Sequence, residues 1–305
     1  MYVYGPVLSW RLGVSLGLDI TCLPKKCSFD CVYCQLGRTE KLVCSPFQSN
    51  IKQKVLSELE EKLTGLESPP DYITFSGTGE PTLNLELGEI IDGIKGISKV
   101  PVAVITNSSF TVLPEVRASL NKSDLVVAKL DAPTQELFEK INRPCPGVKL
   151  DDVVEGISKL ETDVALQMMF FRAEGIDNTT EEVVSGLVEL AEKINPVQVQ
   201  VDTPSRPSEE KTIALNEEEL SRIAARFEEK GIPTTYYHKR EFKKEKLIDQ
   251  GELEAAVLEL VKRRPCTPLD VMGAFGVSRE RAEIVLSSLV AKGLLRVSGR
   301  FYIKK

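Results

Sequence analysis

Histidine is nearly missing from this sequence, because His238 is the single one among 305 residues. Its scarcity excludes metal sites built from several histidines and argues against a hydrolase with a Ser/His or Cys/His pair. No apolar run approaches the roughly 18 residues of a membrane-spanning helix. No basic segment precedes an apolar one at the start, as a secretory signal requires. We therefore expect a cytoplasmic protein without a membrane partner.

Charge is unevenly distributed along the chain, whose net charge is −6. From Lys239 onward there are 15 Lys and Arg against 9 Asp and Glu, whereas the preceding residues carry 24 against 36. A basic region attached to an acidic body indicates two modules with different partners. The alternative is that short basic segments only keep a surface hydrated.

Short apolar runs alternate with amphipathic stretches through the first two thirds of the chain. We expect strands at residues 14–20, 72–76, 102–106, 125–130, 164–171 and 197–201, and helices at 51–66, 85–97, 148–160 and 181–194. Strands that each precede a helix predict a parallel sheet with right-handed crossovers. A closed eight-unit barrel needs about 250 residues. The sequence therefore predicts an α/β fold, a partial (β/α)6 TIM-like barrel.

The pattern changes after this barrel. A loop, a helix and a strand are expected at 203–211, 216–229 and 233–237. The following charge-rich segment predicts a linker. Beyond it we expect helices at 251–262, 268–275 and 279–292 and a hairpin around 298–299, an order typical of a winged helix-turn-helix. The predicted domains are a barrel at 1–238, a charged linker at 239–250 and a winged helix-turn-helix at 251–305.

Three of the seven cysteines lie within eight residues, as Cys27, Cys31 and Cys34 in a C-x3-C-x2-C spacing. Three thiolates this close can hold three corners of a [4Fe–4S] cluster, whose irons prefer sulfur ligands. The fourth iron would stay open to a substrate or cofactor. A structural zinc normally takes four protein ligands, and Cys22 would then supply the fourth. We predict the iron–sulfur cluster, with zinc and coincidence as the alternatives.

The cysteine motif, with the aromatic Tyr33 before its last cysteine, resembles that of the radical S-adenosylmethionine (SAM) superfamily. The resemblance covers roughly residues 1–205. It implies an oxygen-sensitive enzyme in which SAM chelates the open iron of the [4Fe–4S] cluster. An electron from a donor such as ferredoxin or flavodoxin then cleaves SAM to methionine and a 5′-deoxyadenosyl radical.

Polar segments follow the predicted strands, where this family binds SAM. The segment 76–81 resembles the family's Gly-Gly-Glu element, with Thr78 in place of its first glycine. Ligands bind at the carboxyl ends of such strands, although these groups could instead only cap strand ends. We also expect Arg206 to face SAM or substrate. The predicted SAM-contacting residues are Tyr33, Gly79, Glu80, Asn107, Lys129, Asp131 and Gln200.

The opening segment, residues 4–17, resembles a radical SAM subgroup related to the wybutosine-synthesis enzymes, which rebuild a guanosine in transfer RNA. Trp10 stands where a second arginine is common in that subgroup. The resemblance implies a nucleoside or transfer RNA as substrate. Those enzymes carry a second cluster, and the cysteines left for one here are Cys22, Cys44, Cys145 and Cys266. We expect these four to be isolated, buried residues instead.

The C-terminal domain leaves the choice of partner open. Its third predicted helix carries three basic residues against two acidic ones, whereas segment 296–305 has four basic and no acidic residues. A nucleic acid, a protein or peptide contact including dimerisation, and shielding of the barrel mouth all fit. The alternatives to RNA modification are modification of a protein or peptide, including installation of a glycyl radical, and an iron–sulfur transcription factor that senses redox state.

Overall fold

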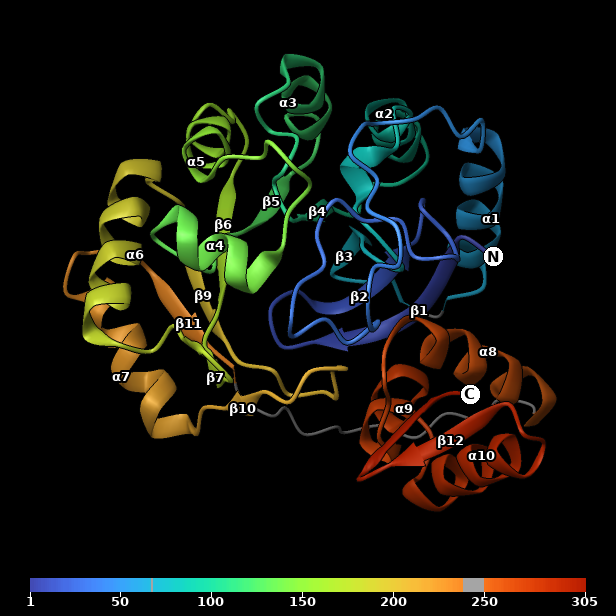
Figure 1. Cartoon of the computed structure of the whole chain (residues 1–305). Helices are drawn as coiled ribbons and strands as arrows, with labels where there is room; N and C mark the ends of the chain where they lie inside the picture. Colours follow the sequence, from blue (N-terminus) through green and yellow to red (C-terminus); the bar gives the residue numbers. More distant parts are fainter. Residues whose placement is uncertain (67, 238–249) are drawn as a thin grey trace.

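The computed structural model describes residues 1–66, 68–237 and 250–305, and its centre is a curled sheet that forms a half-barrel (Figure 1). The eight strands of this sheet, in spatial order, are β1 (Val3–Ser9), β2 (Gly13–Leu18), β3 (Tyr72–Phe75), β4 (Val102–Thr106), β5 (Leu125–Lys129), β6 (Val164–Met169), β9 (Gln198–Asp202) and β11 (Thr234–Tyr236). β1 runs antiparallel to β2, and the other neighbours are parallel. The predicted parallel sheet is therefore confirmed.

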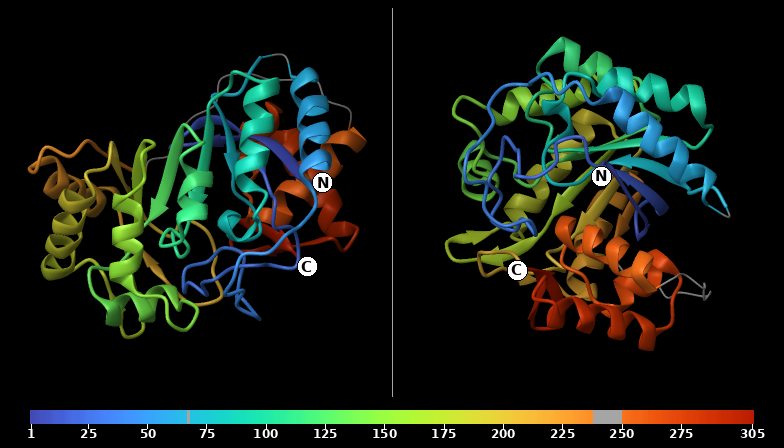
Figure 2. Two further views of the ribbon diagram at one scale, coloured as in Figure 1. Left: turned by 90° about the horizontal axis from the view of Figure 1, so that it is seen from above. Right: turned by 90° about the vertical axis from the view of Figure 1, so that its right-hand side faces the viewer.

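Helices cover the outer face of the half-barrel (Figure 2). They are α1 (Lys52–Thr64), α2 (Leu87–Ile97), α3 (Pro114–Leu120), α5 (Leu150–Ser158), α6 (Glu181–Ile194) and α7 (Glu217–Glu228). The two sheet faces differ in chemistry because successive side chains alternate: Leu16 and Ile73 are fully buried, whereas Ser15 and Thr74 bond to each other, Oγ to Oγ1, at 2.5 Å. Among the described residues, no helix is long and apolar enough to cross a membrane.

Several elements of the barrel were not predicted from the sequence. One is β1, which contains Gly5 and Pro6 and has a register shift between Tyr4 and Val7; proline lacks an N–H donor and is tolerated on an edge strand such as this one. Two others are short helices, α3 and α4 (Gln135–Asn142). The predicted strand 164–171 divides into β6 and β7 (Phe171–Ala173), which forms a small sheet with β8 (Ile176–Asp177) and β10 (Ile213–Ala214).

Residues 250–305 form a second unit, named here the C-terminal module. Its elements are α8 (Gln250–Arg263), α9 (Pro268–Phe275), α10 (Arg279–Ala291), β12 (Leu295–Ser298) and β13 (Phe301–Lys304). Helices and hairpin lie where the sequence predicted them, and the winged helix-turn-helix assignment stays a prediction. The module has its own buried core. The predicted linker, apart from Gln250, and His238 lie outside the described residues.

The C-terminal module contacts two parts of the barrel that are far apart in the sequence. Tyr4 and Val7 of β1 pack against its core. Asp270 of α9 accepts from Arg206, in the loop after β9, at 2.6 Å, and Arg264 lies 3.2 Å from the same carboxylate. Burial would raise the pKa of Asp270, but the two guanidinium groups, followed by the hydrogen bonds from Thr267, lower it from 3.8 to about 2. The charged form of Asp270 therefore helps to hold the module in place.

We predict that Asp270→Asn lowers the free energy of unfolding by about 2 kcal/mol at pH 7. The pKa of Asp270 is depressed in the folded state, so this stabilisation is complete above about pH 4 and is lost as the pH falls through about 2. Urea unfolding of both proteins at several pH values measures the difference. Asp92→Asn is the control, because Asp92 pairs with Lys122 on the exposed surface. A difference that does not change between pH 7 and pH 2 contradicts the prediction.

Candidate functional site

The three cysteines of the predicted cluster lie in the long loop after β2, and an N–H group points at each sulfur. Cys27 Sγ accepts from Asn107 Nδ2 at 3.6 Å, and Cys31 Sγ accepts from Asn142 Nδ2 at 3.5 Å. Lys25 Nζ lies 3.2 Å from Cys34 Sγ. Donors of this kind favour a thiolate or a cluster-bound sulfur over a neutral thiol. The surroundings of the three sulfurs thus fit a bound cluster.

Without a metal, burial keeps the thiols of Cys27 and Cys31 protonated at neutral pH. Burial, followed by the neighbouring thiol of Cys34, raises the pKa of Cys31 to about 12. Burial also raises the pKa of Cys27 well above its usual range, with Cys31 as the next cause. Within the described residues, no three His, Cys, Asp or Glu side chains are arranged as a finished metal site. Metal binding must therefore displace protons from these thiols.

The loop after β3 brings Gly79 and Glu80 against the cysteine loop. A Cβ atom on Gly79 would lie 1.9 Å from the carbonyl oxygen of Lys26, so only glycine fits there. Glu80 N donates to that same carbonyl at 2.9 Å. The Glu80 carboxylate is buried and accepts four hydrogen bonds, from Thr82 N, Thr82 Oγ1, Thr106 Oγ1 and Asn107 N. Burial still raises its pKa. Glu80 thus joins the ends of β3 and β4.

Asp131 has the corresponding position after β5. Its Oδ2 accepts from the Tyr33 hydroxyl and, at 2.8 Å, from Asn142 Nδ2. Its Oδ1 accepts from Met169 N at 2.8 Å and lies 3.5 Å from Lys129 Nζ. The Lys129 ammonium is also 4.7 Å from the centre of the Tyr33 ring. Asp131 therefore fastens the cysteine loop to the ends of β5 and β6.

The remaining predicted residues lie further from the cysteines. Gln200 is in register with Gln167, which is in register with Lys129, so the three form one polar row across β9, β6 and β5. Gln200 is 1% exposed, and within the described residues its Oε1 has no hydrogen-bond partner. Arg206 instead pairs with Asp270 of the C-terminal module. The structure thus brings every predicted SAM contact except Gln200 directly beside the cysteine loop.

Sequence reasoning missed two donors to the sulfurs. Asn142 ends α4, a helix that was not predicted, and it links Cys31 to Asp131. Lys25 precedes the motif by two residues and also donates to the carbonyl of Gly37 at 2.6 Å. A lysine two residues before the first cysteine could have indicated a positive charge near the cluster. Nothing local in the sequence distinguished Asn142.

Acidic residues of the loop after β9 cover part of the cysteine loop. Glu210 pairs with Arg143 at the end of α4 through Arg143 Nη2 at 2.9 Å, and with Arg38 at 3.4 Å. A small pocket beneath them is lined by Cys31, Cys34, Glu209 and others. Opening these ion pairs would widen access to the cysteines from this side.

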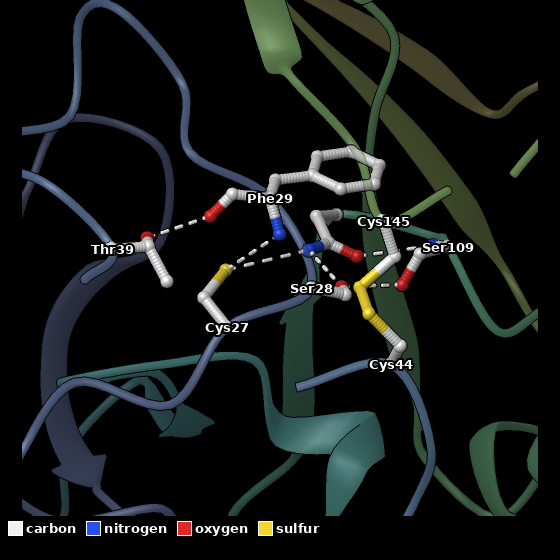
Figure 3. The surroundings of a disulfide bond; sticks show 8 residues. Cys27, Ser28, Phe29, Thr39, Cys44, Ser109 and Cys145 are labelled. Carbon is white, nitrogen blue, oxygen red and sulfur yellow. Dashed lines mark hydrogen bonds between the residues drawn. A yellow bond between two sulfur atoms is a disulfide. The ribbon is translucent and has the colours of Figure 1, made fainter. Parts of the chain in front are cut away.

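A disulfide joins Cys44 to Cys145 beside the cysteine loop (Figure 3). The neighbouring Val43 N donates to the carbonyl of Cys27, and Cys145 N donates to that of Ser28, at 2.9 and 2.8 Å. The expectation that both cysteines are isolated was wrong. Their pairing also removes two of the four cysteines left for a second cluster. Disulfides are rare in a reducing cytoplasm, where this pair would be two adjacent thiols.

We predict that Cys44→Ala destabilises the oxidised apoprotein by about 2–4 kcal/mol, because a bridge across a long loop restricts the unfolded chain. Cys44 itself is exposed, so truncation alone costs little. Urea unfolding without reductant measures the loss. The same comparison in excess phosphine reductant is the control, and there the difference should vanish. Seven free thiols in the native, unreduced protein would contradict the prediction.

Comparison with known proteins agrees with the chemistry of this site. A family model described as the Radical SAM superfamily matches residues 22–163, which contain the cysteine loop, Gly79 and Glu80. A UPF0026 protein of Synechocystis sp. is 37% identical over 207 residues, covering 67% of this chain and 76% of that protein. The chain belongs to the radical SAM superfamily. It is therefore a radical SAM enzyme, and the superfamily implies SAM and an iron–sulfur cluster as cofactors.

Other relatives cover more of this chain. A Brachyspira hyodysenteriae protein named GTPase Obg is 33% identical over 303 residues, and this chain spans only 43% of it. Among solved structures, the half-barrel is similar to a radical SAM methyltransferase from Sphaerobacter thermophilus, with a TM-score of 0.51 at 15% identity, covering 74% of this chain and 67% of that one. This likeness shows the fold alone. The narrower resemblance to the wybutosine-synthesis enzymes stays a prediction.

Proposed function

We propose that Cys27, Cys31 and Cys34 hold a [4Fe–4S] cluster at which this enzyme reductively cleaves SAM. The observation that carries the proposal is the N–H donor at each of the three sulfurs, beside the Gly79 close approach. When bound, the cluster supplies the electron that breaks the carbon–sulfur bond of SAM. The chain holds the cluster, orients SAM and keeps water out.

The other residues of the site divide into two roles. Glu80 and Asp131 have their carboxylate oxygens committed to protein donors, so we assign them to fixing the strand ends. Lys129 places a cation beside the Tyr33 ring, where it can pair with the methionine carboxylate. The backbone at Gly79 can approach a ligand closely because no side chain intervenes. We therefore expect Lys129 and the backbone at Gly79 to touch SAM.

We predict that the wild-type enzyme, reconstituted anaerobically with iron and sulfide and reduced with dithionite, converts SAM to 5′-deoxyadenosine. Cys31→Ala should lose at least about 99% of this activity, because two thiolates cannot hold the cluster. Mass spectrometry of the nucleoside and iron analysis measure both results. Cys266→Ala is the matched control, because Cys266 lies in the core of the C-terminal module. Binding of zinc alone, or deoxyadenosine from both proteins equally, would contradict the assignment.

For the substrate we propose a nucleoside or transfer RNA. The support is the hairpin β12–β13, where Arg296, Arg300, Lys304 and Lys305 are exposed. Among the described residues, no acidic side chain forms an ion pair with any of the four. Exposed cations attract the phosphate backbone. The module would then act as the winged helix predicted from its element order.

One observation favours a protein or peptide substrate instead. Two basic residues at the ends of α10, which would enter the groove in a winged helix, already have acidic partners. Arg279 pairs with Glu283 at 2.9 Å, and Lys292 pairs with Glu254 of α8. A helix that reads a nucleic-acid groove usually presents free Lys and Arg. If α10 contacts a macromolecule, its surface is therefore better suited to a protein than to RNA.

We predict that Arg296→Glu/Arg300→Glu weakens transfer RNA binding at least about tenfold and lowers the slope of affinity against salt by about two, because two phosphate contacts are lost. Fluorescence anisotropy with the holoenzyme at several salt concentrations measures both quantities. Arg222→Glu/Lys230→Glu on the barrel makes the same change in net charge and is the control. If both variants lose RNA affinity equally, or if the wild type binds no RNA, the proposed substrate becomes a protein or peptide.

A further inference from the structure

The C-terminal module inserts one buried arginine into the barrel. Arg263, the last residue of α8, has a side chain that is only 7% exposed, and its Nε lies 3.3 Å from Asp19 Oδ2. Its guanidinium carbon is 4.8 Å from the centre of the Tyr4 ring, and Nη2 donates to the carbonyl of Met1 at 2.9 Å. Nη1 pairs with Glu259 one turn earlier. Asp19 is the only barrel carboxylate in ion-pair range of Arg263 among the described residues.

Asp19 in turn holds the loop after β3. Its two oxygens accept from Thr78 Oγ1 at 2.9 and 3.1 Å, and its Oδ1 accepts from Thr21 Oγ1 at 3.1 Å. The carboxylate packs so closely on Gly77 that a Cβ there would lie 2.4 Å from Asp19 Cγ. Tyr4 supports the same loop, because its hydroxyl is 2.7 Å from Ser76 Oγ. Contacts from the amino-terminal segment thus fix residues 76–78, directly before Gly79.

Thr78 is the residue that differs from the family's Gly-Gly-Glu pattern. A glycine at this position would have no hydroxyl to bind Asp19, so the substitution creates the link between the loop and the carboxylate. Asp19 is 1% exposed, and a buried carboxylate requires a nearby cation or several donors. Arg263 supplies that cation from the C-terminal module. Thr78, Asp19 and Arg263 therefore form one continuous chain of contacts.

We propose that Arg263 is a positioning residue for SAM: through Asp19 and Thr78 it holds the Gly79 backbone in the conformation that receives the cofactor. This inference rests on the proposed function of the Gly79–Glu80 loop in SAM binding. It makes the C-terminal module a part of the SAM site, in addition to any contact the module makes with a substrate. Arg263 itself touches no reacting atom.

The experiment compares Arg263→Gln, Arg263→Lys, Asp19→Asn and the Asp19→Asn/Arg263→Gln double variant, each as the full chain with reconstituted cluster. Lys262→Gln is the matched control, because Lys262 is the neighbouring residue and pairs with Glu259 alone among the described residues. Equilibrium dialysis measures the Kd for SAM without turnover. Hydrogen exchange of the peptide covering 76–84, iron content and Tm are measured on the same samples.

Arg263→Gln should raise the Kd for SAM about tenfold at unchanged iron content, with faster exchange in 76–84. Arg263→Lys, which keeps the charge, should recover part of the affinity. The double variant should bind no more weakly than the weaker single variant, because both substitutions break one chain of contacts. Lys262→Gln should behave as the wild type.

The proposal is overturned if Arg263→Gln binds SAM within twofold of Lys262→Gln, or if the losses from Asp19 and Arg263 add in the double variant. If Arg263→Gln does not fold, Arg263→Lys and Asp19→Asn decide, since both keep a full-length side chain in place. If the wild type binds no SAM, the proposed function fails. Hydrogen exchange of 76–84 in the apoprotein then still shows whether Arg263 orders this loop.

Discussion

The site depends on the need to satisfy two carboxylates that are buried at the carboxyl edge of the sheet. Glu80 and Asp131 are each about 2% exposed, and both accept hydrogen bonds from more than one element of the barrel. An unpaired buried charge is costly, so the folded state must bring those donors together. One consequence is that Tyr33 fixes the cysteine loop to this edge of the sheet. The strand ends thus form a frame that holds the cysteine loop.

The barrel and the C-terminal module have separate cores, but the barrel depends on contacts that the module supplies. A deletion of residues 247–305 would uncover Tyr4 and Val7 and would leave Asp19 buried without its cation. Loss of RNA binding after such a deletion would therefore report damage to the barrel as readily as loss of an RNA surface. Substitutions on the exposed hairpin avoid this difficulty, since they leave the interface with β1 unchanged.

The parts of the molecule that could be predicted from sequence are those that local patterns encode. Neighbouring residues alone define the apolar runs of the six barrel strands and the spacing of Cys27, Cys31 and Cys34. Polar residues that follow parallel strands must lie at the same edge of the sheet, so their proximity could also be predicted. The contacts between residues far apart could not be predicted this way. Arg263 and Asp19 meet from opposite ends of the chain, and Cys44 meets Cys145 across a separation of 101 residues. Each of these pairs requires the three-dimensional fold.

The distribution of charge shows how far composition can guide the choice of partner. The basic balance of the C-terminal region counts every Lys and Arg equally, yet Arg263 and Arg264 are committed to Asp19 and Asp270 inside the molecule. The charge of Arg263 holds the module on the barrel, whereas that of Arg264 pairs with Asp270 inside the module, and both guanidinium groups are largely buried away from an external partner. Among the described residues of the module, the exposed cations without an acidic partner lie on the hairpin β12–β13. Some basic residues of such a region serve an internal interface. Only the exposed Lys and Arg side chains are therefore evidence about the substrate.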